Sequence, residues 1–435
     1  MAAAVARASD ADRAAESFDD AFDSVAALAL AGRSGADLGL TPEHAMLRST
    51  LRDFAERLLR PRAQAIHRQD LDVPEDVIRG VAELGLFGLS IPEEYGGTLS
   101  GRPDHIAMLI GTEELSAASL AAGGSLMTRP EILVRALLSA AAEEQKRRWL
   151  PKIASGEALV AVAVTEPDVG SDVAAVQCRA VRRDDGAWEV TGGKLWCTFA
   201  GRGHLLMLLC RTGPRESGHR GLSLFVLEKP SFEGHDFEVR QPEGGRLSGR
   251  AIPTLGYRGL HTFELVFDRY RLPAEALVGE EGRGFYLQME GFSTGRLQTA
   301  GRAVGVMQAA VRDSLAYTRE RRAFGKPIAE HPVARQMLGR MVSRLEASRQ
   351  LSYWAARLLD EGKGQMEASL AKLYASRMAE YVTRDATQLF GGMGYGEETD
   401  VSRYFVDARV LAIFEGAEEV LALRVIGRAL EKSRD

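Results

Sequence analysis

The spacing of apolar positions divides the chain into three stretches. Over residues 46–58 these positions recur every three or four residues, which is typical of one face of a helix. The run Thr41–Glu43 precedes them and supplies a side-chain cap, a first-turn proline and a first-turn acid. Comparable patterns continue to Leu150, so residues 42–160 are predicted to form an N-terminal helical domain.

The period changes after residue 160. Short runs rich in Val, Leu, Phe and Thr alternate with turn residues such as Asp184-Asp185-Gly186 and Gly192-Gly193. This pattern predicts a β domain, a barrel or a sandwich, over 161–277. Within it, residues 230–256 are predicted to form a long Gly-rich loop.

After Pro273 the helical period returns in longer pieces. One predicted helix runs to Arg322, the next carries the face that starts at Val333, and two more cover about 366–390 and 417–431. Four long helices in succession predict an antiparallel four-helix bundle over 278–435. The expected fold class is therefore α+β with several domains, in the order helical domain, β domain and helical bundle.

Residues 1–41 stand apart because they are rich in alanine and acidic residues. That acidity argues against a secretory or mitochondrial leader, and it leaves a short helix and a frayed tail as equal alternatives. The net charge is −5, the three cysteines match no metal-ligand spacing, and no apolar run is long enough to span a membrane. We therefore expect a cytoplasmic protein that binds neither nucleic acid, membrane nor metal.

Two segments of the predicted β domain are candidates for ligand binding. The loop Thr165–Asp172 follows a strand, and its backbone N–H groups with the Ser171 hydroxyl can hold a carbonyl or phosphate oxygen. Trp196 and Thr198 lie two apart on a predicted strand, so an indole and a hydroxyl face one side and suit a flat heterocycle. An ordinary capped turn and a core tryptophan are the simpler alternatives.

Three further candidates lie in the predicted bundle. Arg321–Pro327 ends a helix and is either a C-terminal cap or an arginine fork for pyrophosphate, with Phe324 against an adenine. The Gly-rich run Gln388–Tyr395 follows a helix, so it fits neither a Rossmann fingerprint nor a P-loop. Glu415 lies between an apolar pair and Gly416, where it either caps a helix or removes a weakly acidic C–H proton.

Together with Gly88–Gly97 and Asp407-Ala408-Arg409, these segments resemble the acyl-CoA dehydrogenase family over about residues 42–430. The resemblance implies the same three-domain order, with FAD at the junction of the β domain and the C-terminal helices, and a second subunit that completes the site. It further implies a homo-oligomer, a tetramer or a dimer, that passes electrons to electron-transferring flavoprotein.

The resemblance also assigns roles to single residues. Thr165 would bond the flavin ring through its backbone, Ser171 would lie near the pyrophosphate and the thioester tail, and Trp196 and Thr198 would pack on and bond the isoalloxazine. The implied cofactor-binding residues are Val164, Thr165, Ser171, Trp196, Thr198, Arg321, Phe324, His331, Gln388, Gly391, Gly392, Ala417 and Glu419. Arg321, Phe324 and the run 388–392 would act from the neighbouring subunit. Three positions depart from the family's pattern, namely Ala417 for Thr, Pro332 for Gln and Val406 for Arg.

Glu415 would be the catalytic base in a member of this family. It would remove the pro-R-type α-proton of an acyl-CoA while flavin N5 takes the β-hydride, and its N–H would polarise the thioester carbonyl. One branch places its base on the long helix before the residue that corresponds to Arg296, but Ser293-Thr294-Gly295 contains no carboxylate and Glu290 lies two turns back. The substrate-binding residues implied are Ser171, Arg129, Ser293, Arg296 and Gly416.

Several runs, among them 196–200, 284–291 and 405–417, look most like the branch that oxidises (2S)-methylsuccinyl-CoA to mesaconyl-CoA in the ethylmalonyl-CoA pathway. A dicarboxylate needs a cation for its free carboxylate, and we expect Arg129 to supply it, with Tyr257 and Arg258 as competitors. The simpler alternative for Arg129 is a surface helix start before Pro130. Isobutyryl-, 2-methylbutyryl- and glutaryl-CoA are alternative substrates. An O₂-reactive flavin monooxygenase or oxidase, or a flavin-free scaffold, are alternatives of other classes.

Overall fold

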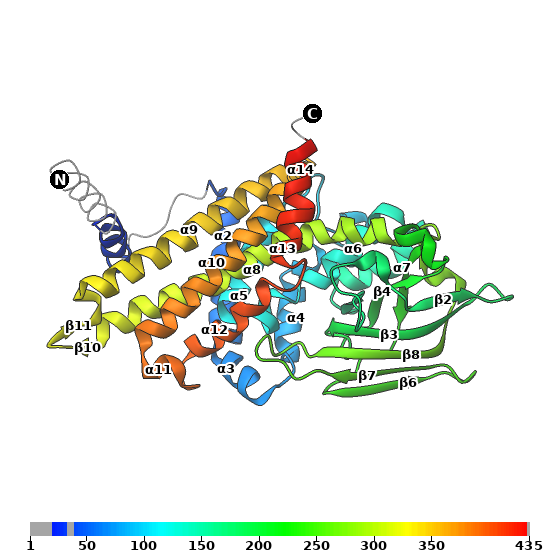
Figure 1. The fold of residues 1–435 in the computed structure, drawn as a ribbon, viewed down its shortest axis with the longest axis horizontal. Coiled ribbons are helices and arrows are strands. Elements are labelled where there is room, and N and C mark those ends of the chain that lie inside the picture. Colours follow the sequence, from blue (N-terminus) through cyan, green and yellow to red (C-terminus); the bar gives the residue numbers. More distant parts are fainter. Residues whose placement is uncertain (1–19, 33–38, 433–435) are drawn as a thin grey trace, which may run out of the picture.

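The computed structural model describes residues 20–32 and 39–432 and confirms the α+β fold class in three parts (Figure 1). The first part is helical. Thr41 caps its first long helix as predicted, since its hydroxyl accepts from the backbone N–H of His44 at 3.2 Å. The helices are α2 (Pro42–Phe54), α3 (Arg60–Gln69), α4 (Glu75–Glu83), α5 (His105–Ala118), α6 (Thr128–Ala140) and α7 (Glu143–Ala154).

The described residues of the middle part form one nine-stranded sheet. Its order is β6-β7-β8-β3-β2-β4-β5-β9, and β1 pairs with β4 in parallel. The strands are β1 (Val160–Ala163), β2 (Arg179–Arg182), β3 (Trp188–Thr198), β4 (Leu205–Arg211), β5 (Leu222–Glu228), β6 (Asp236–Arg240), β7 (Arg246–Ala251), β8 (Thr262–Leu272) and β9 (Leu277–Val278). The sheet lies at one end of the molecule, beside α6 and α7 (Figure 1).

The third part is helical again, and a small hairpin interrupts it. The long helix α8 starts beside the sheet and ends at the hairpin at the far end of the molecule (Figure 1). The elements are α8 (Gly284–Glu320), β10 (Arg322–Ala323), β11 (Lys326–Pro327), α9 (Pro332–Asp360), α10 (Gln365–Phe390), α11 (Gly392–Tyr395), α12 (Asp400–Leu411), α13 (Glu418–Val420) and α14 (Gly427–Lys432).

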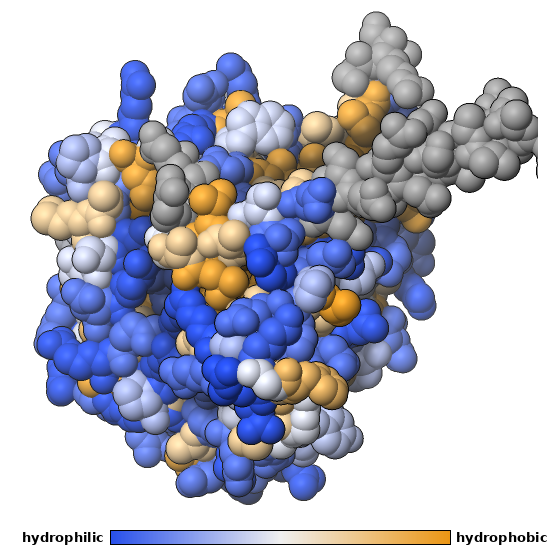
Figure 2. All heavy atoms as spheres, turned by 90° about the vertical axis from the view of Figure 1, so that its left-hand side faces the viewer, coloured by the Kyte–Doolittle hydropathy of each residue, from blue (hydrophilic) through white to orange (hydrophobic). Residues whose placement is uncertain are grey.

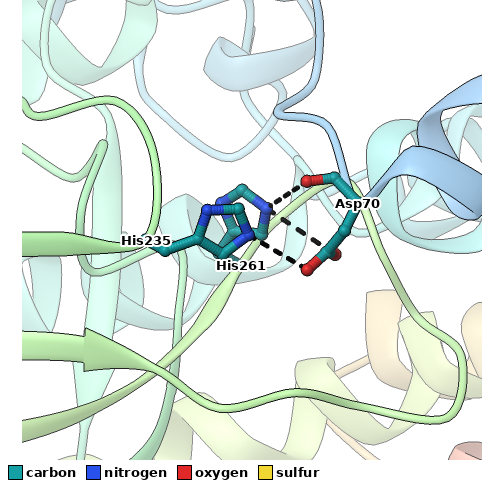
Figure 3. Close-up of side chains that lie close together, drawn as sticks. All are labelled: Asp70, His235 and His261. Carbon is teal, nitrogen blue, oxygen red and sulfur yellow. Dashed lines mark hydrogen bonds and ion pairs between the residues drawn. The ribbon is translucent and has the colours of Figure 1, made fainter.

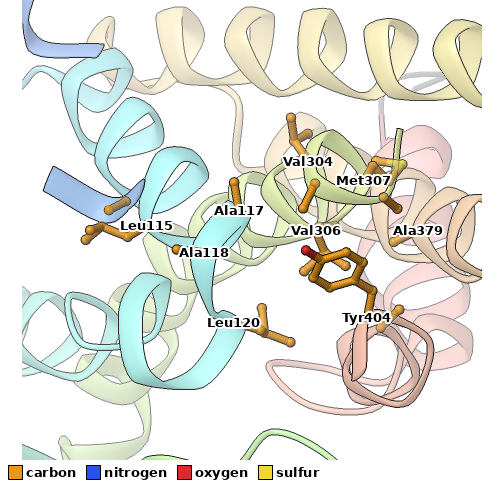
Figure 4. Packing of buried hydrophobic residues seen from close by; sticks show 14 of the residues in the cluster. Leu115, Ala117, Ala118, Leu120, Val304, Val306, Met307, Ala379 and Tyr404 are labelled. Carbon is orange, nitrogen blue, oxygen red and sulfur yellow. The ribbon is translucent and has the colours of Figure 1, made fainter. Parts of the chain in front are cut away.

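One hydrophobic core joins the first and third parts. Leu115, Ala117 and Ala118 of α5 belong to this core together with Val304 and Met307 of α8, and the two helices pack against each other (Figure 4). Small residues bring these two backbones together, because a side chain at Gly305 would lie 2.3 Å from the backbone oxygen of Glu113. Residues 20–30 are helical too, and the buried Ala26 and Ala29 belong to the same core.

The structure adds elements that the sequence pattern does not predict. Within the predicted Gly-rich loop 230–256, β6 and β7 form a hairpin; β6 corresponds to a strand-like run at 237–240, whereas the charged residues of β7 hide its apolar alternation. The predicted helices do not include α12, and α8 begins at Gly284, far earlier than its apolar stripe indicates. In the described residues no helix is long and apolar enough to cross a bilayer.

Candidate active site

Glu415 lies in the turn between α12 and α13. Its φ of +53° is unusual for a non-glycine residue, and Gly416 follows at +99°. The two left-handed residues direct the carboxylate toward α8, where a side-chain carbon at Gly295 would lie only 3.2 Å from Glu415 Oε2. Oε2 is buried and has no hydrogen-bond partner among the described residues. The carboxylate is therefore held close to α8 with one oxygen free to accept a proton.

A buried lysine of α10 fixes this turn. The Nζ of Lys372 donates to the backbone oxygen of Gly416 at 2.7 Å. Burial lowers the pKa of Lys372 to about 8, against the opposing effect of the Glu415 carboxylate. Lys372 thus adds a positive charge to the surroundings of Glu415 whenever it is protonated.

Two arginines of α8 extend this positive charge. Burial lowers the pKa of both Arg296 and Arg302, and the Glu415 carboxylate opposes that shift in each case. Arg302 is fully buried, and its guanidinium carbon lies 4.5 Å from the centroid of the Phe414 ring. The residue next to the expected base therefore packs on a cation.

Arg129 reaches the same place from the start of α6. Its Nη2 donates to the Tyr257 hydroxyl at 2.9 Å, and its Nη1 donates to the Ser125 backbone oxygen at 2.9 Å. Arg302 Nη1 lies 3.4 Å from the same tyrosine oxygen and 3.2 Å from the Ser125 hydroxyl. The simpler expectation for Arg129, a surface helix start, is wrong, because the residue is buried.

We call Arg296, Arg302 and Lys372, which interact electrostatically with Glu415, together with Arg129, which shares the Tyr257 hydroxyl with Arg302, the cationic cluster. Arg129 and Arg302 make hydrogen bonds to neutral groups, and no carboxylate lies within ion-pair distance of either in the described chain. Arg129 and Arg302 therefore carry buried positive charge that no ion pair compensates in the described chain. Such an arrangement suits an anionic group that arrives with a ligand.

The residues predicted near the flavin ring lie along the sheet edge that carries the loop after β1. The Glu166 carboxylate anchors this loop, since it accepts from the N–H groups of Gln177 and Cys178 and from Lys194 Nζ, each at 2.8 Å. The backbone oxygens of Val164 and Thr165 are already engaged, by Lys194 Nζ at 2.9 Å and by the N–H of Leu195 at 2.8 Å. Ser171 is exposed.

Trp196 and Thr198 do not follow the simple alternation expected of a strand. The pairing of β3 with β8 shifts register between Lys194 and Cys197, and Trp196 has a φ of +60°. The indole is 54% exposed, whereas the Thr198 hydroxyl is buried and lies 3.0 Å from that of Thr262. The bulge leaves a large aromatic ring exposed on the surface.

The residues predicted on the adenine side lie at the opposite end of α8. From Gly295 to Arg321 this helix advances by about 40 Å, so these residues are far from Glu415 in the same chain. Phe324 is 97% exposed, and His331 Nε2 lies 3.0 Å from the backbone oxygen of Ala323. Gln388, Gly391 and Gly392 are exposed at the end of α10. This end of the molecule faces the viewer in Figure 2, and apolar side chains gather there between hydrophilic ones.

The remaining predicted residues lie close to Glu415 in the chain or on α8. Ala417 and Glu419 follow Glu415 directly at the start of α13, and Ser293 is half-buried two residues before Gly295. Sequence reasoning missed Arg302 and Lys372. Arg302 lies two turns after Gly295 on the same face of α8, and Lys372 stands among buried alanines on α10, so a charge on an apolar face was the available signal.

Three family models match this chain in the order of its three parts. They describe the acyl-CoA dehydrogenase N-terminal domain over residues 41–157, the middle domain over 161–270 and the C-terminal domain over 282–431. The chain belongs to the acyl-CoA dehydrogenase family. Members of this family are flavin-dependent oxidoreductases that act on CH–CH groups.

Individual acyl-CoA dehydrogenases agree with this assignment. The (2S)-methylsuccinyl-CoA dehydrogenase of Cereibacter sphaeroides is 41% identical over 395 residues, which cover 90% of this chain and 70% of that protein. The structure of butyryl-CoA dehydrogenase from Megasphaera elsdenii aligns with a TM-score of 0.83 at 30% identity, over 90% of this chain and 98% of that one. A Mycobacterium smegmatis glutaryl-CoA dehydrogenase in complex with FADH2 aligns with a TM-score of 0.81 at 25% identity, over 91% of this chain and 96% of that one.

Proposed function

We propose that this acyl-CoA dehydrogenase oxidises (2S)-methylsuccinyl-CoA to mesaconyl-CoA with Glu415 as the base. The observation that carries the choice of substrate is the pair of buried guanidiniums of Arg129 and Arg302, which share the Tyr257 hydroxyl and lack a carboxylate partner among the described residues. A neutral acyl group would leave both charges uncompensated, whereas a terminal carboxylate would accept hydrogen bonds from both. The similarity to a (2S)-methylsuccinyl-CoA dehydrogenase supports the same choice.

The proton step rests on Glu415. Its Oε2 has no hydrogen-bond partner in the described chain and is the atom that would take the α-proton. Lys372 holds the Gly416 oxygen and so orients the Glu415–Gly416 turn.

The residues present fit FAD, which supplies the hydride acceptor when bound. The exposed indole of Trp196 offers a stacking surface, and the Thr198 hydroxyl lies beside that of Thr262. A side-chain carbon added at Gly391 or Gly392 would meet no atom within 4 Å, so a ligand can approach the backbone there. The exposed Phe324 and the span of α8 support an adenine side completed by a second copy. Transfer of electrons to electron-transferring flavoprotein, a dimeric or tetrameric state and a cytoplasmic location stay predictions.

A panel of acyl-CoAs tests the proposal. The purified protein is mixed anaerobically with methylsuccinyl-, glutaryl-, isobutyryl-, 2-methylbutyryl- and butyryl-CoA, and loss of the yellow flavin absorbance is followed. We expect methylsuccinyl-CoA to bleach the flavin at the lowest concentration. Faster bleaching by a neutral acyl-CoA would contradict the substrate, rapid reoxidation by O₂ would indicate an oxidase, and a colourless protein would contradict flavin binding.

A further inference from the structure

Three side chains outside the active site meet where the N-terminal helices contact the sheet. Asp70 follows α3 and has a φ of +51°, His235 directly precedes β6, and His261 directly precedes β8 (Figure 3). Asp70 lies 165 residues from His235 in the chain, so no local spacing indicates that they meet. The proposed dehydrogenation uses none of the three.

Their polar atoms converge at the spacing of metal ligands. His235 Nε2 lies 3.0 Å from Asp70 Oδ2, and His261 Nε2 lies 3.7 Å from Asp70 Oδ1. All three ligand atoms lie within 4.8 Å of one another. In a tetrahedral zinc site with bonds of about 2.0–2.2 Å, ligand atoms are about 3.2–3.6 Å apart. Small side-chain shifts would therefore bring a Zn²⁺ ion into contact with all three residues.

A carboxylate behind His261 completes the pattern. His261 Nδ1 lies 3.1 Å from Asp72 Oδ1, and Asp72 Oδ2 accepts from the N–H of Gly234 at 2.9 Å. Histidines that bind a metal usually donate their second ring nitrogen to a carboxylate, and Asp72 lies close enough to His261 Nδ1 to accept such a bond after a small rotation of the ring. Asp72 therefore leaves Nε2 of His261 directed at the cluster. That Nε2 donates to the Asp70 backbone oxygen at 2.9 Å, a hydrogen bond that zinc binding would replace.

Asp70, His235 and His261 differ in how far they are exposed to solvent. The His261 side chain is buried, Asp70 is half-buried, and His235 is 52% exposed. An ion can enter from the His235 side, and a water molecule can occupy the remaining coordination position there. One cation lies nearby, since Arg258 Nε is 4.0 Å from Asp70 Oδ1, but its guanidinium also donates to the backbone oxygens of Thr254 and His67.

We propose that Asp70, His235 and His261 bind Zn²⁺, with Asp72 as the supporting carboxylate. Two imidazoles and a carboxylate are a ligand set that zinc accepts among the divalent metals. The ion would tie the end of α3 to the two sheet segments that precede β6 and β8. Its role is to stabilise the contact between the helical part and the sheet.

Zinc titration of the full-length protein tests this proposal. After removal of metals with EDTA, ZnCl₂ is added in a calorimeter at neutral pH, and the melting temperature is measured with and without the ion. We expect one zinc per chain and a higher melting temperature in its presence. His235→Ala, which changes a half-exposed side chain, should bind zinc at least about tenfold more weakly and lose the thermal shift.

Two further variants separate a metal site from an ion-pair cluster. Asp72→Asn should weaken zinc binding by about 10–100-fold, as expected for a supporting carboxylate. His44→Ala is the matched control, because His44 pairs with a single carboxylate, Asp104, at 2.9 Å and should not affect zinc binding. Absence of zinc binding by the wild-type protein, or equal binding by wild type and His235→Ala, would overturn the proposal.

Discussion

Two groups of buried charges differ in how completely they are paired. In the first, the balanced cluster, three glutamates meet three arginines from α2, α5 and α9; its members are Arg48, Arg52, Glu113, Glu114, Glu346 and Arg349. Glu113 is held by Arg48 Nη2 at 2.7 Å and by Arg349 Nε at 2.8 Å. In the cationic cluster, Arg129 and Arg302 are buried and form no ion pair in the described chain.

The difference separates a structural role from a binding role. The neighbouring arginines hold the pKa of Glu113 below its usual value despite complete burial, so charge compensation is already achieved within the protein. In the cationic cluster, burial lowers the pKa of Arg302 and no carboxylate bonds it in the described chain. The protein therefore carries an uncompensated charge at the place where an anionic substrate is proposed to bind.

The largest effect is expected at the one acid of the cationic cluster. Glu415→Gln keeps the shape of the side chain but removes the proton acceptor, so the rate of flavin bleaching by substrate should fall by about 10²–10⁴-fold. FAD content, measured by absorbance, should stay unchanged. Persistent bleaching would show that another residue is the base.

The balanced cluster should respond in stability rather than in rate. Glu113→Gln removes the buried carboxylate that pairs with both Arg48 and Arg349, which then keep only Glu114 and Glu346, and should lower the free energy of unfolding by about 3–5 kcal/mol, measured by urea denaturation. Glu144→Gln on the exposed surface of α7 is the control and should change stability by less than about 0.5 kcal/mol.

A change in the free energy of unfolding of the opposite sign is expected when an arginine of the cationic cluster is replaced. Arg302→Met removes a buried charge that lacks a carboxylate partner, so stability should stay unchanged or increase. A loss comparable to that of Glu113→Gln would mean that the two clusters do not differ in the way described.

Substrate discrimination provides a smaller test of the same contrast. Arg129→Met should raise KM for methylsuccinyl-CoA by about tenfold or more, because a buried charged hydrogen bond is lost, and should leave KM for butyryl-CoA nearly unchanged. Arg147→Met, an exposed residue paired with Glu143, is the control. Equal effects on both substrates would exclude Arg129 as the carboxylate ligand.

The smallest effect concerns the pH dependence of stability. Lys372 has a pKa of about 8 in the folded protein, below the value near 10.4 of an unfolded chain. Between these values only the unfolded chain holds the proton, so the stability of the wild type relative to Lys372→Met should rise with pH, by about 1.4 kcal/mol per unit at most. Burial also lowers the pKa of Lys229, to about 7. Lys229 is present in both proteins, so its contribution cancels when the free energy of unfolding of Lys372→Met is subtracted from that of the wild type. A difference that does not change with pH would show that Lys372 is not buried as described.

The sequence predicts the three-part fold better than it predicts the contacts of the cationic cluster. Helix periodicity, the Thr41 cap and the turn residues of the sheet are local signals, and they suffice for the three-part fold. The segment around Glu415 is contiguous, so a family resemblance can single it out, and its role as the base stays a prediction. The pairing of Arg129 with Tyr257 and Arg302 joins three distant segments, and neither period nor propensity carries such information. The bulge at Trp196 escapes prediction because it depends on the register with β8.

The length of helix α8 determines how the active site would respond to an inserted residue. It contains 37 residues and carries Gly295 and Arg302 in its middle and the Phe324 hairpin beyond its end. One residue inserted between Gly284 and Gly295 would turn either the sheet end or the site end of this rod by about 100° and advance it by about 1.5 Å. The number of residues in α8, rather than their composition, therefore fixes the distance and the rotation between the sheet end of the helix and Gly295 and Arg302.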